Sequence, residues 1–241
     1  MKVLYAGDSP PGGAANYLLG ILNYLKTDLL HFPPGVSLPQ DVFKDFWDVI
    51  IFSDYKCDNV PYAVQKKIVQ QVHAGTGFWM IGGWASFTGL NAGWKNSLIE
   101  SILPVKCLAK DDRRNFFSGA VIQSKSKNTI LKKLSFEISP VICGLNKVLV
   151  KKDSQLILSA QLIGKKGMLI DKEYPLLIIN KNKQIKTMAL TTDLAPHWCG
   201  GLVDWGNRRQ SLSVNKDISV EVGNFYIRFV SSLLDWLSFN H

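Results

Sequence analysis

Cysteine is scarce in this chain, and its four cysteines lie far apart. Cys57, Cys107, Cys143 and Cys199 form no C-x-x-C pair. Zinc knuckles need such pairs, and small disulfide-linked domains need a denser set of cysteines. We therefore expect neither a metal site nor a disulfide framework.

Long hydrophobic runs are also missing. No segment reaches the roughly 20 apolar residues that a membrane-spanning helix needs. The first residues, MKVLYAGDSPPGG, lack the long apolar region and the small-residue cleavage site of a signal peptide, and they are typical of a first β-strand. We therefore expect a cytoplasmic protein without a membrane partner.

Nucleotide-binding motifs are incomplete. The stretch GDSPPGGAAN places Gly12-Gly13 just before a helix, whose free N–H groups could hold an anion. It lacks the Lys-Ser/Thr pair of a P-loop, and it does not match G-x-G-x-x-G. A flexible loop leading into a helix is the favoured interpretation, and no cofactor is expected.

The chain carries a net charge of +9, and the excess is concentrated in its middle. Residues 106–186 hold 17 Lys/Arg against 6 Asp/Glu, a balance of +11. Many of these lysines form doublets at strand ends, as at Lys132-Lys133, Lys151-Lys152 and Lys165-Lys166, with no aromatic residues interleaved for base stacking. Solvated lysines that protect edge strands explain them best, so no nucleic-acid partner is expected.

The first ninety residues alternate between strand and helix patterns. Residues 2–7, 49–52 and 77–81 are short apolar runs, whereas residues 61–75 begin with proline, end with glycine and have helical spacing between them. Apolar strands without polar alternation are typical of a parallel sheet covered on both faces. The sequence therefore predicts an α/β fold.

The second half has a different character. Short β-type runs follow one another, and LLIINKNKQIKTMAL predicts a hairpin that turns at residues 181–183. The chain closes with a helix pattern in VGNFYIRFVSSLLDWLSF. Without a linker or a repeat, we expect one domain over residues 1–241, with a β-rich insertion at roughly 106–186.

Four segments follow predicted strands and are candidates for a site. They are residues 8–16, 53–55, 82–86 and 193–198. Ligands of open α/β sheets bind beyond the carboxyl ends of the parallel strands, so these segments should converge. In the last of them, His197 could act as a general base or could be a packed histidine that fixes its loop. Cys199 lacks a demonstrable partner that would lower its pKa, which favours a structural thiol.

Several of these stretches resemble a known family. MIGGWASFTG, SPVICGLN, the hairpin and above all TTDLAPHWCGGLVDWG are similar to the glutamine amidotransferase-like family, a relative of the class I glutamine amidotransferases. The resemblance spans essentially the whole chain, and D-x-A-P-H-W…DW is its most specific element. It implies a flavodoxin-like, doubly wound, mostly parallel sheet with a cleft at the turn after residue 81.

The residues of the amidotransferase triad are mostly missing. Class I enzymes of this kind carry a cysteine on that turn, and a histidine followed two residues later by glutamate. The matched turn is Gly82-Gly83-Trp84-Ala85-Ser86, and Cys199 stands where the glutamate would be. Only His197 matches, so glutaminase chemistry by the usual route is not expected.

Two functional hypotheses follow from the resemblance. The first is a degenerate active site that binds a small polar ligand or serves as an assembly domain, with ligand-binding residues Asp8, Asp54, Gly82, Gly83, Trp84, Asp193 and Trp198. The alternative is a hydrolase or lyase on a small polar substrate, using catalytic His197 with Ser86 or a carboxylate, by the logic of a triad on an unrelated fold. Ser86 is also a candidate helix N-cap.

Aromatic residues in irregular segments predict self-association. Trp94, Phe116, Phe117 and Trp205 are expected at the surface, and such residues are favoured in the centres of subunit contacts. We therefore expect a homo-oligomer.

Overall fold

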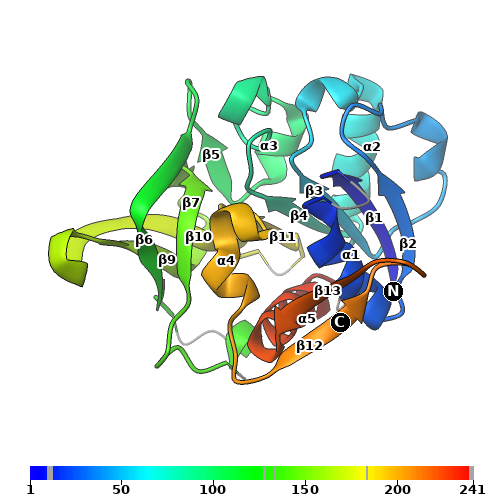
Figure 1. Ribbon diagram of the computed structural model, residues 1–241. Coiled ribbons are helices and arrows are strands. Elements are labelled where there is room, and N and C mark those ends of the chain that lie inside the picture. Colours follow the sequence, from blue (N-terminus) through cyan, green and yellow to red (C-terminus); the bar gives the residue numbers. More distant parts are fainter. Residues whose placement is uncertain (10–12, 127–128, 133, 183, 239–241) are drawn as a thin grey trace.

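The fold is built on one mixed sheet of nine strands in a computed structural model, with the order β2-β1-β3-β4-β11-β10-β9-β6-β7 (Figure 1). The structure describes residues 1–9, 13–126, 129–132, 134–182 and 184–238. Five neighbouring strands are parallel: β1 (Lys2–Gly7), β2 (Asp28–Phe32), β3 (Val49–Ser53), β4 (Gly77–Ile81) and β11 (Thr187–Leu190). Four more continue the sheet in antiparallel pairs: β10 (Leu169–Asn180), β9 (Ser154–Ile163), β6 (Arg113–Ser124) and β7 (Val141–Asn146).

Side-chain alternation along the parallel strands divides the core into two layers. In β3, Val49 and Ile51 belong to the cluster that contains α1 (Ala15–Tyr24) and α5 (Asn224–Ser238). Ile50 and Phe52 belong to the cluster that contains α2 (Tyr62–His73) and α3 (Leu98–Ile102). Both faces of these strands are therefore covered, which is why their sequences are uniformly apolar. The predicted α/β fold with a doubly wound, mostly parallel sheet is confirmed.

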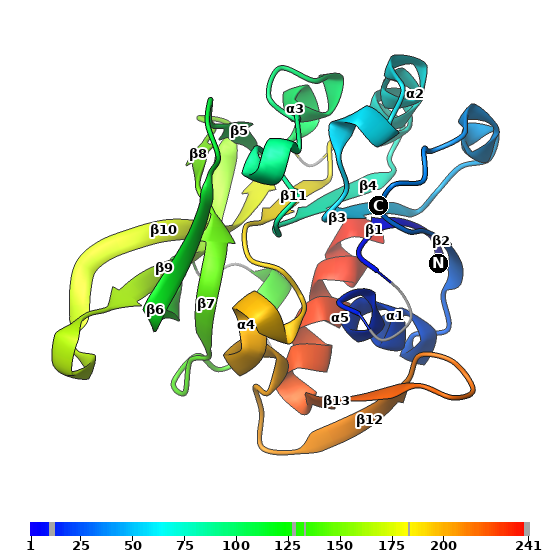
Figure 2. The same ribbon diagram turned by 45° about the horizontal axis from the view of Figure 1, so that its top comes forward.

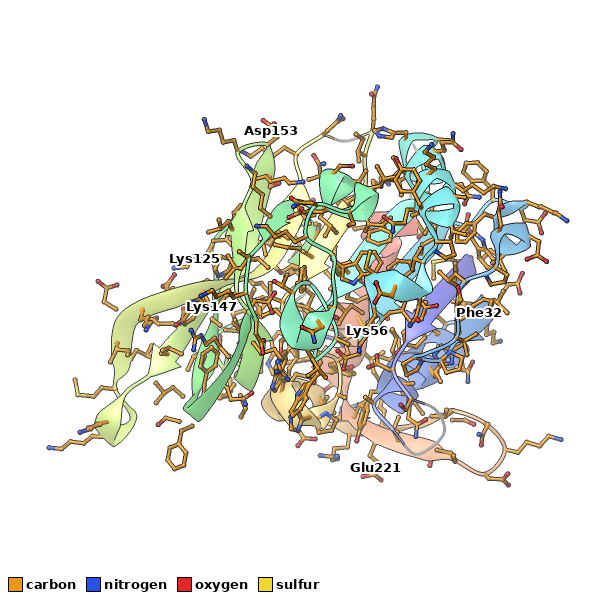
Figure 3. All side chains as sticks on the ribbon, turned by 90° about the horizontal axis from the view of Figure 1, so that it is seen from above. Phe32, Lys56, Lys125, Lys147, Asp153 and Glu221 are labelled. Carbon is orange, nitrogen blue, oxygen red and sulfur yellow. The ribbon has the colours of Figure 1, made fainter. Side chains whose placement is uncertain are left out.

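The antiparallel half is continuous with the parallel half. The predicted hairpin is present, because β10 pairs with β11, although Lys183 of its turn lies outside the described residues. β9 and β10 extend beyond the helices as an arm (Figure 2). Seen from above, Lys125 and Lys147 lie on this antiparallel side, opposite Phe32 at the end of β2 (Figure 3). The strands of residues 106–186 thus extend the main sheet, apart from two short ones.

Smaller elements complete the chain. β5 (Val105–Cys107) pairs with β8 (Val148–Val150), and β12 (Arg209–Ser213) pairs with β13 (Ser219–Gly223). The β12–β13 hairpin lies against α1. Short 3-10 turns are found at Gln40–Phe43, Cys57–Asn59, Gly89–Asn91, Thr129–Leu131 and Lys165–Gly167. The stretch after residue 195 was expected to be a loop, but it forms α4 (Pro196–Val203), which begins with proline at its first position.

The surface aromatics differ from expectation at two positions. Trp94 and Trp205 are buried, and each indole N–H donates to a backbone carbonyl, of Tyr55 and Ile138 respectively. Phe117 is fully exposed, as expected. Their position in irregular segments wrongly predicted exposure, because both tryptophans anchor their segments to the core.

Across the described residues, no helix combines the length and apolar character that crossing a membrane requires.

Candidate functional site

The ends of the parallel strands meet at one edge of the sheet, as predicted. Asp8 follows β1 and its N–H donates to the carbonyl of Ser53 at the end of β3, over 3.0 Å. Gly82 follows β4 and donates to the carbonyl of Thr192 beyond β11, over 3.1 Å. These bonds join segments far apart in the sequence, so that Asp8, Asp54 and Asp193 come to interact electrostatically.

The turn after β4 is held from one side by Asp54. The Asp54 carboxylate accepts the N–H of Ala85 at 2.7 Å and packs against the Cα of Gly83, where any side chain would collide with it. Ser86 donates its hydroxyl to the carbonyl of Ile81 at 2.6 Å and accepts the N–H of Asp54 at 3.0 Å. The hydroxyl of Ser86 therefore closes the turn on itself and links it to the end of β3.

Asn146 holds the same turn from the other side. Its side-chain oxygen accepts the N–H of Gly83 at 2.8 Å, and its amide nitrogen donates to the Gly83 carbonyl at 3.0 Å. The amide nitrogen also donates to Asp112 at 2.7 Å, and Asp112 accepts two bonds from Thr88. Asn146 is fully buried at the end of β7. Sequence reasoning missed it, although a polar residue closing the apolar run VICGLN was a usable indication.

Burial away from water is the largest influence on the pKa values of these aspartates. Desolvation, reinforced by the nearby Asp54, raises the pKa of Asp8 to about 7, despite hydrogen bonds from Tyr5 and Ser53. The Tyr5 hydroxyl donates to Asp8 at 2.5 Å. Desolvation likewise raises the pKa of Asp54 to about 6, while the Ala85 N–H and Arg113 oppose the shift. No lysine, arginine or histidine within the described residues forms an ion pair with these carboxyl groups.

Asp193 is the most deeply placed of the three. It is 9% exposed, and burial together with the charges of Asp8 and Asp54 raises its pKa well above the ordinary value. Cys199 lies beside it, and its thiol donates to the Ala195 carbonyl at 3.1 Å. Burial, followed by the charge of Asp193, raises the pKa of Cys199 strongly. This thiol therefore lacks the depressed pKa of a nucleophilic cysteine.

Trp84 forms the exposed tip of the turn. The guanidinium carbon of Arg113 lies 4.9 Å from the centre of its ring, and the ring of His197 lies 5.8 Å away. His197 is exposed at the start of α4, and no hydrogen bond joins it to Ser86 among the described residues. Trp198 is buried, its indole N–H donates to Asn115 of β6 at 2.8 Å, and its ring packs against Gly144 of β7. Whether any predicted site residue contacts a ligand stays a prediction.

The donor groups at this edge are not arranged as a metal centre. Within the described part of the chain, no group of three or more His, Cys, Asp or Glu side chains could hold a metal ion. What the geometry offers is a rigid turn, three poorly solvated carboxyl groups, and a tryptophan flanked by a guanidinium and an imidazole.

The fold thus combines a mixed sheet covered by helices on both faces, a tight turn after β4 and a histidine beyond β11. Residues 48–216 match the family described as "Putative glutamine amidotransferase", GATase1-like, and the chain belongs to this family. No protein of curated function matches the sequence.

Solved structures share the fold. Cytoplasmic protein STM3548 from Salmonella typhimurium is 22% identical, with a TM-score of 0.75, and the match covers 98% of this chain and 99% of that one. Cytoplasmic protein STM1381 from Salmonella typhimurium LT2 is also 22% identical, with a TM-score of 0.71 over 98% and 99% of the two chains. A ThuA-like protein from Parabacteroides merdae is 11% identical, with a TM-score of 0.63 over 99% and 90%.

Proposed function

We propose that the edge formed by Asp8, Asp54 and Asp193 binds a small polar ligand that carries a positively charged amino group. The observation that carries the proposal is the set of three poorly solvated carboxyl groups with no cationic side chain paired to them in the described residues. Ionised carboxylates away from water are costly unless a counter-charge or hydrogen-bond donors compensate them. A ligand ammonium group would supply both.

The surrounding residues favour a small ligand. The Asp54 carboxylate already accepts the N–H of Ala85, which fixes its orientation. Trp84, with Arg113 and His197 on its ring, offers a flat surface and polar groups next to the carboxyl groups. A ligand with an amino group at one end and a polar or planar part at the other would match this arrangement.

The active site is degenerate in this proposal. No cysteine stands on the turn, Cys199 is buried with a raised pKa, and the hydroxyl of Ser86 is occupied by Ile81. We expect no release of ammonia from glutamine above a heat-inactivated control. Turnover, or stoichiometric labelling of the turn by a thiol-reactive glutamine analogue, would disprove this part of the proposal.

Ligand binding is tested with a matched pair of probes. Ethanolamine and ethylene glycol differ in whether an ammonium group replaces a hydroxyl. At a pH of about 8, where the ionised forms of Asp8 and Asp54 predominate, ethanolamine should raise the melting temperature of the wild type and ethylene glycol should not. Asp54→Asn should reduce the ethanolamine effect, whereas Asp153→Asn, at an exposed position, should preserve it. Equal responses to both probes would contradict the proposal.

A second candidate is a hydrolase or lyase that uses His197 with Ser86 or a carboxylate. The observation in its favour is the pKa of Asp8 near 7, which suits a group that exchanges protons at neutral pH. Turnover of a small ester or amide substrate that is lost in Asp8→Asn, with the fold intact, would establish this candidate over the first.

A cytoplasmic location and self-association are part of the proposal. Two structural relatives are described as cytoplasmic proteins.

Phe117 is fully exposed, and Met168, Leu169 and Ile170 expose apolar surface at the tip of the β9–β10 arm. Such surface is favoured at subunit contacts, which supports a homo-oligomer.

A further inference from the structure

A pocket lies away from the carboxyl groups, where α1, α5 and the start of β12 come together. Its volume is about 560 Å³, and Arg208 and Arg228 are the charged side chains among the described residues that line it. The remaining lining consists of the rings of Tyr24 and Phe225, three side-chain amides and one isoleucine. The three elements lie side by side in both ribbon views (Figures 1 and 2).

The two arginines are not neutralised by neighbouring carboxylates. Within the described residues, neither guanidinium forms an ion pair, and that of Arg228 lies 5.6 Å from the centre of the Phe225 ring. Asp204 and Glu221, the nearby acids on this hairpin side, instead both pair with Arg209, at 2.7 Å and 3.5 Å. Arg209 does not line the pocket. The pocket therefore keeps two cationic groups free for a ligand.

The backbone around the pocket is fixed before any ligand arrives. The side-chain oxygen of Asn224 accepts the N–H groups of Asn207 and Arg208, at 3.1 Å and 3.3 Å. The N–H of Asn224 donates to the Arg208 carbonyl at 2.9 Å. Arg208 is thus tied to the first residue of α5, and Arg228 stands one helical turn further along. Because the backbone that carries both arginines is already fixed, binding loses less backbone conformational entropy.

Recognition would come from the side chains and not from the helix end. The N–H groups of Phe225 and Tyr226 already donate to the carbonyl of Trp205, at 3.1 Å and 3.3 Å. Two guanidinium groups match the charge and the geometry of a phosphate dianion. Tyr24 is 57% exposed and leaves a ring face available for stacking.

We propose that this pocket binds a small molecule that carries a phosphate group next to a planar ring. Phenyl phosphate is the simplest probe with both features, and inorganic phosphate, benzoate and phenol separate them. Calorimetric or NMR titration of the wild type should give saturable binding of phenyl phosphate, weaker binding of inorganic phosphate and benzoate, and none of phenol. Shifted amide resonances should map to residues 207–210 and 224–228.

Substitutions separate a specific site from general charge attraction. Arg208→Gln and Arg228→Gln should each weaken binding of phenyl phosphate about tenfold or more, because each removes a charge-assisted hydrogen bond. Arg209→Gln, a neighbouring arginine that is already paired, is the matched control and should change affinity by less than about twofold. Tyr24→Ala should remove the preference for phenyl phosphate over inorganic phosphate.

Several outcomes would overturn the proposal. They are an equal loss in Arg209→Gln, binding of benzoate as tight as that of phenyl phosphate, and no saturable binding of either phosphate. Unchanged circular dichroism of each variant excludes misfolding as the reason for a loss. Substitution at Asp54 should leave phenyl phosphate binding intact, because the two sites are separate.

Discussion

At the scale of single residues, Asn146 is the side chain on which the turn most depends. Its side-chain amide forms hydrogen bonds with the N–H and the carbonyl of Gly83 and with the Asp112 carboxylate. A buried amide with this many partners fixes the turn without a nucleophile or a ligand. The rigidity of the turn is therefore a property of the fold.

Asn146→Ala should lower the free energy of unfolding by about 2–3 kcal/mol, because it removes the side-chain partner of both backbone groups of Gly83 and one of the donors to the Asp112 carboxylate in the interior. Chemical denaturation measures this. Gln40→Ala, which removes an exposed side-chain amide, is the control and should cost less than about 0.5 kcal/mol. Equal effects of the two substitutions would mean that the turn does not depend on Asn146.

Ser86→Ala distinguishes a structural serine from a catalytic one. Removing the hydroxyl breaks its bonds with Ile81 and Asp54 and should cost about 1–2 kcal/mol of stability, with amine binding weakened only modestly. Denaturation and ethanolamine titration measure the two effects. A variant of unchanged stability that loses an enzymatic activity of the wild type would instead make Ser86 a nucleophile.

At the scale of elements, the strand ends concentrate negative charge, which makes stability depend on pH. Asp8, Asp54 and Asp193 all have a pKa in the folded chain above the value of about 4 in an unfolded chain. Between those values the folded chain holds more protons than the unfolded chain. The stabilisation is therefore complete at low pH and decreases as the pH rises through about 6 for Asp54 and about 7 for Asp8.

Asp54→Asn should accordingly stabilise the protein at a pH of about 8, by on the order of 1–3 kcal/mol, and should flatten the decline in stability between a pH of about 4 and about 6. The asparagine oxygen can still accept the Ala85 N–H, and asparagine tolerates the left-handed backbone of this position. Thermal unfolding across pH measures the change. A variant as pH-sensitive as the wild type would show that Asp54 is not one of the groups responsible.

The elements also show what sequence reasoning could reach. Apolar runs such as residues 49–52 predict buried parallel strands, and the rule for strand ends brings Asp8, Asp54, Gly83 and Asp193 together. Asn146, Asp112 and Arg113 were missed. They reach the site only because β6 and β7 pair at the far end of the same sheet, and such long-range pairing leaves no local pattern. His197 was expected in a loop. It lies instead in the first turn of α4, which begins at Pro196.

At the scale of the whole molecule, the most exposed apolar side chains of the antiparallel half include Phe117, Ile138 and Met168. Phe117 lies on β6 and Met168 lies beside β10, and α4 contacts this half through Trp198, which bonds to β6 and packs on β7. We predict a dimer at micromolar concentration in light scattering. Met168→Asp combined with Phe117→Ser should give a monomer with unchanged melting behaviour at low concentration. A monomeric wild type would contradict the prediction.

The central claim is that the three poorly solvated carboxyl groups of Asp8, Asp54 and Asp193 bind a cationic ligand. Carbon-detected NMR titration of the aspartate carboxyl groups tests this claim most directly. Without ligand, we predict midpoints near 7 for Asp8 and near 6 for Asp54, and a raised midpoint for Asp193. Ethanolamine at saturating concentration should lower them, because an ammonium group stabilises the ionised form. Midpoints in the ordinary range of about 4 that do not respond to ethanolamine would contradict the claim.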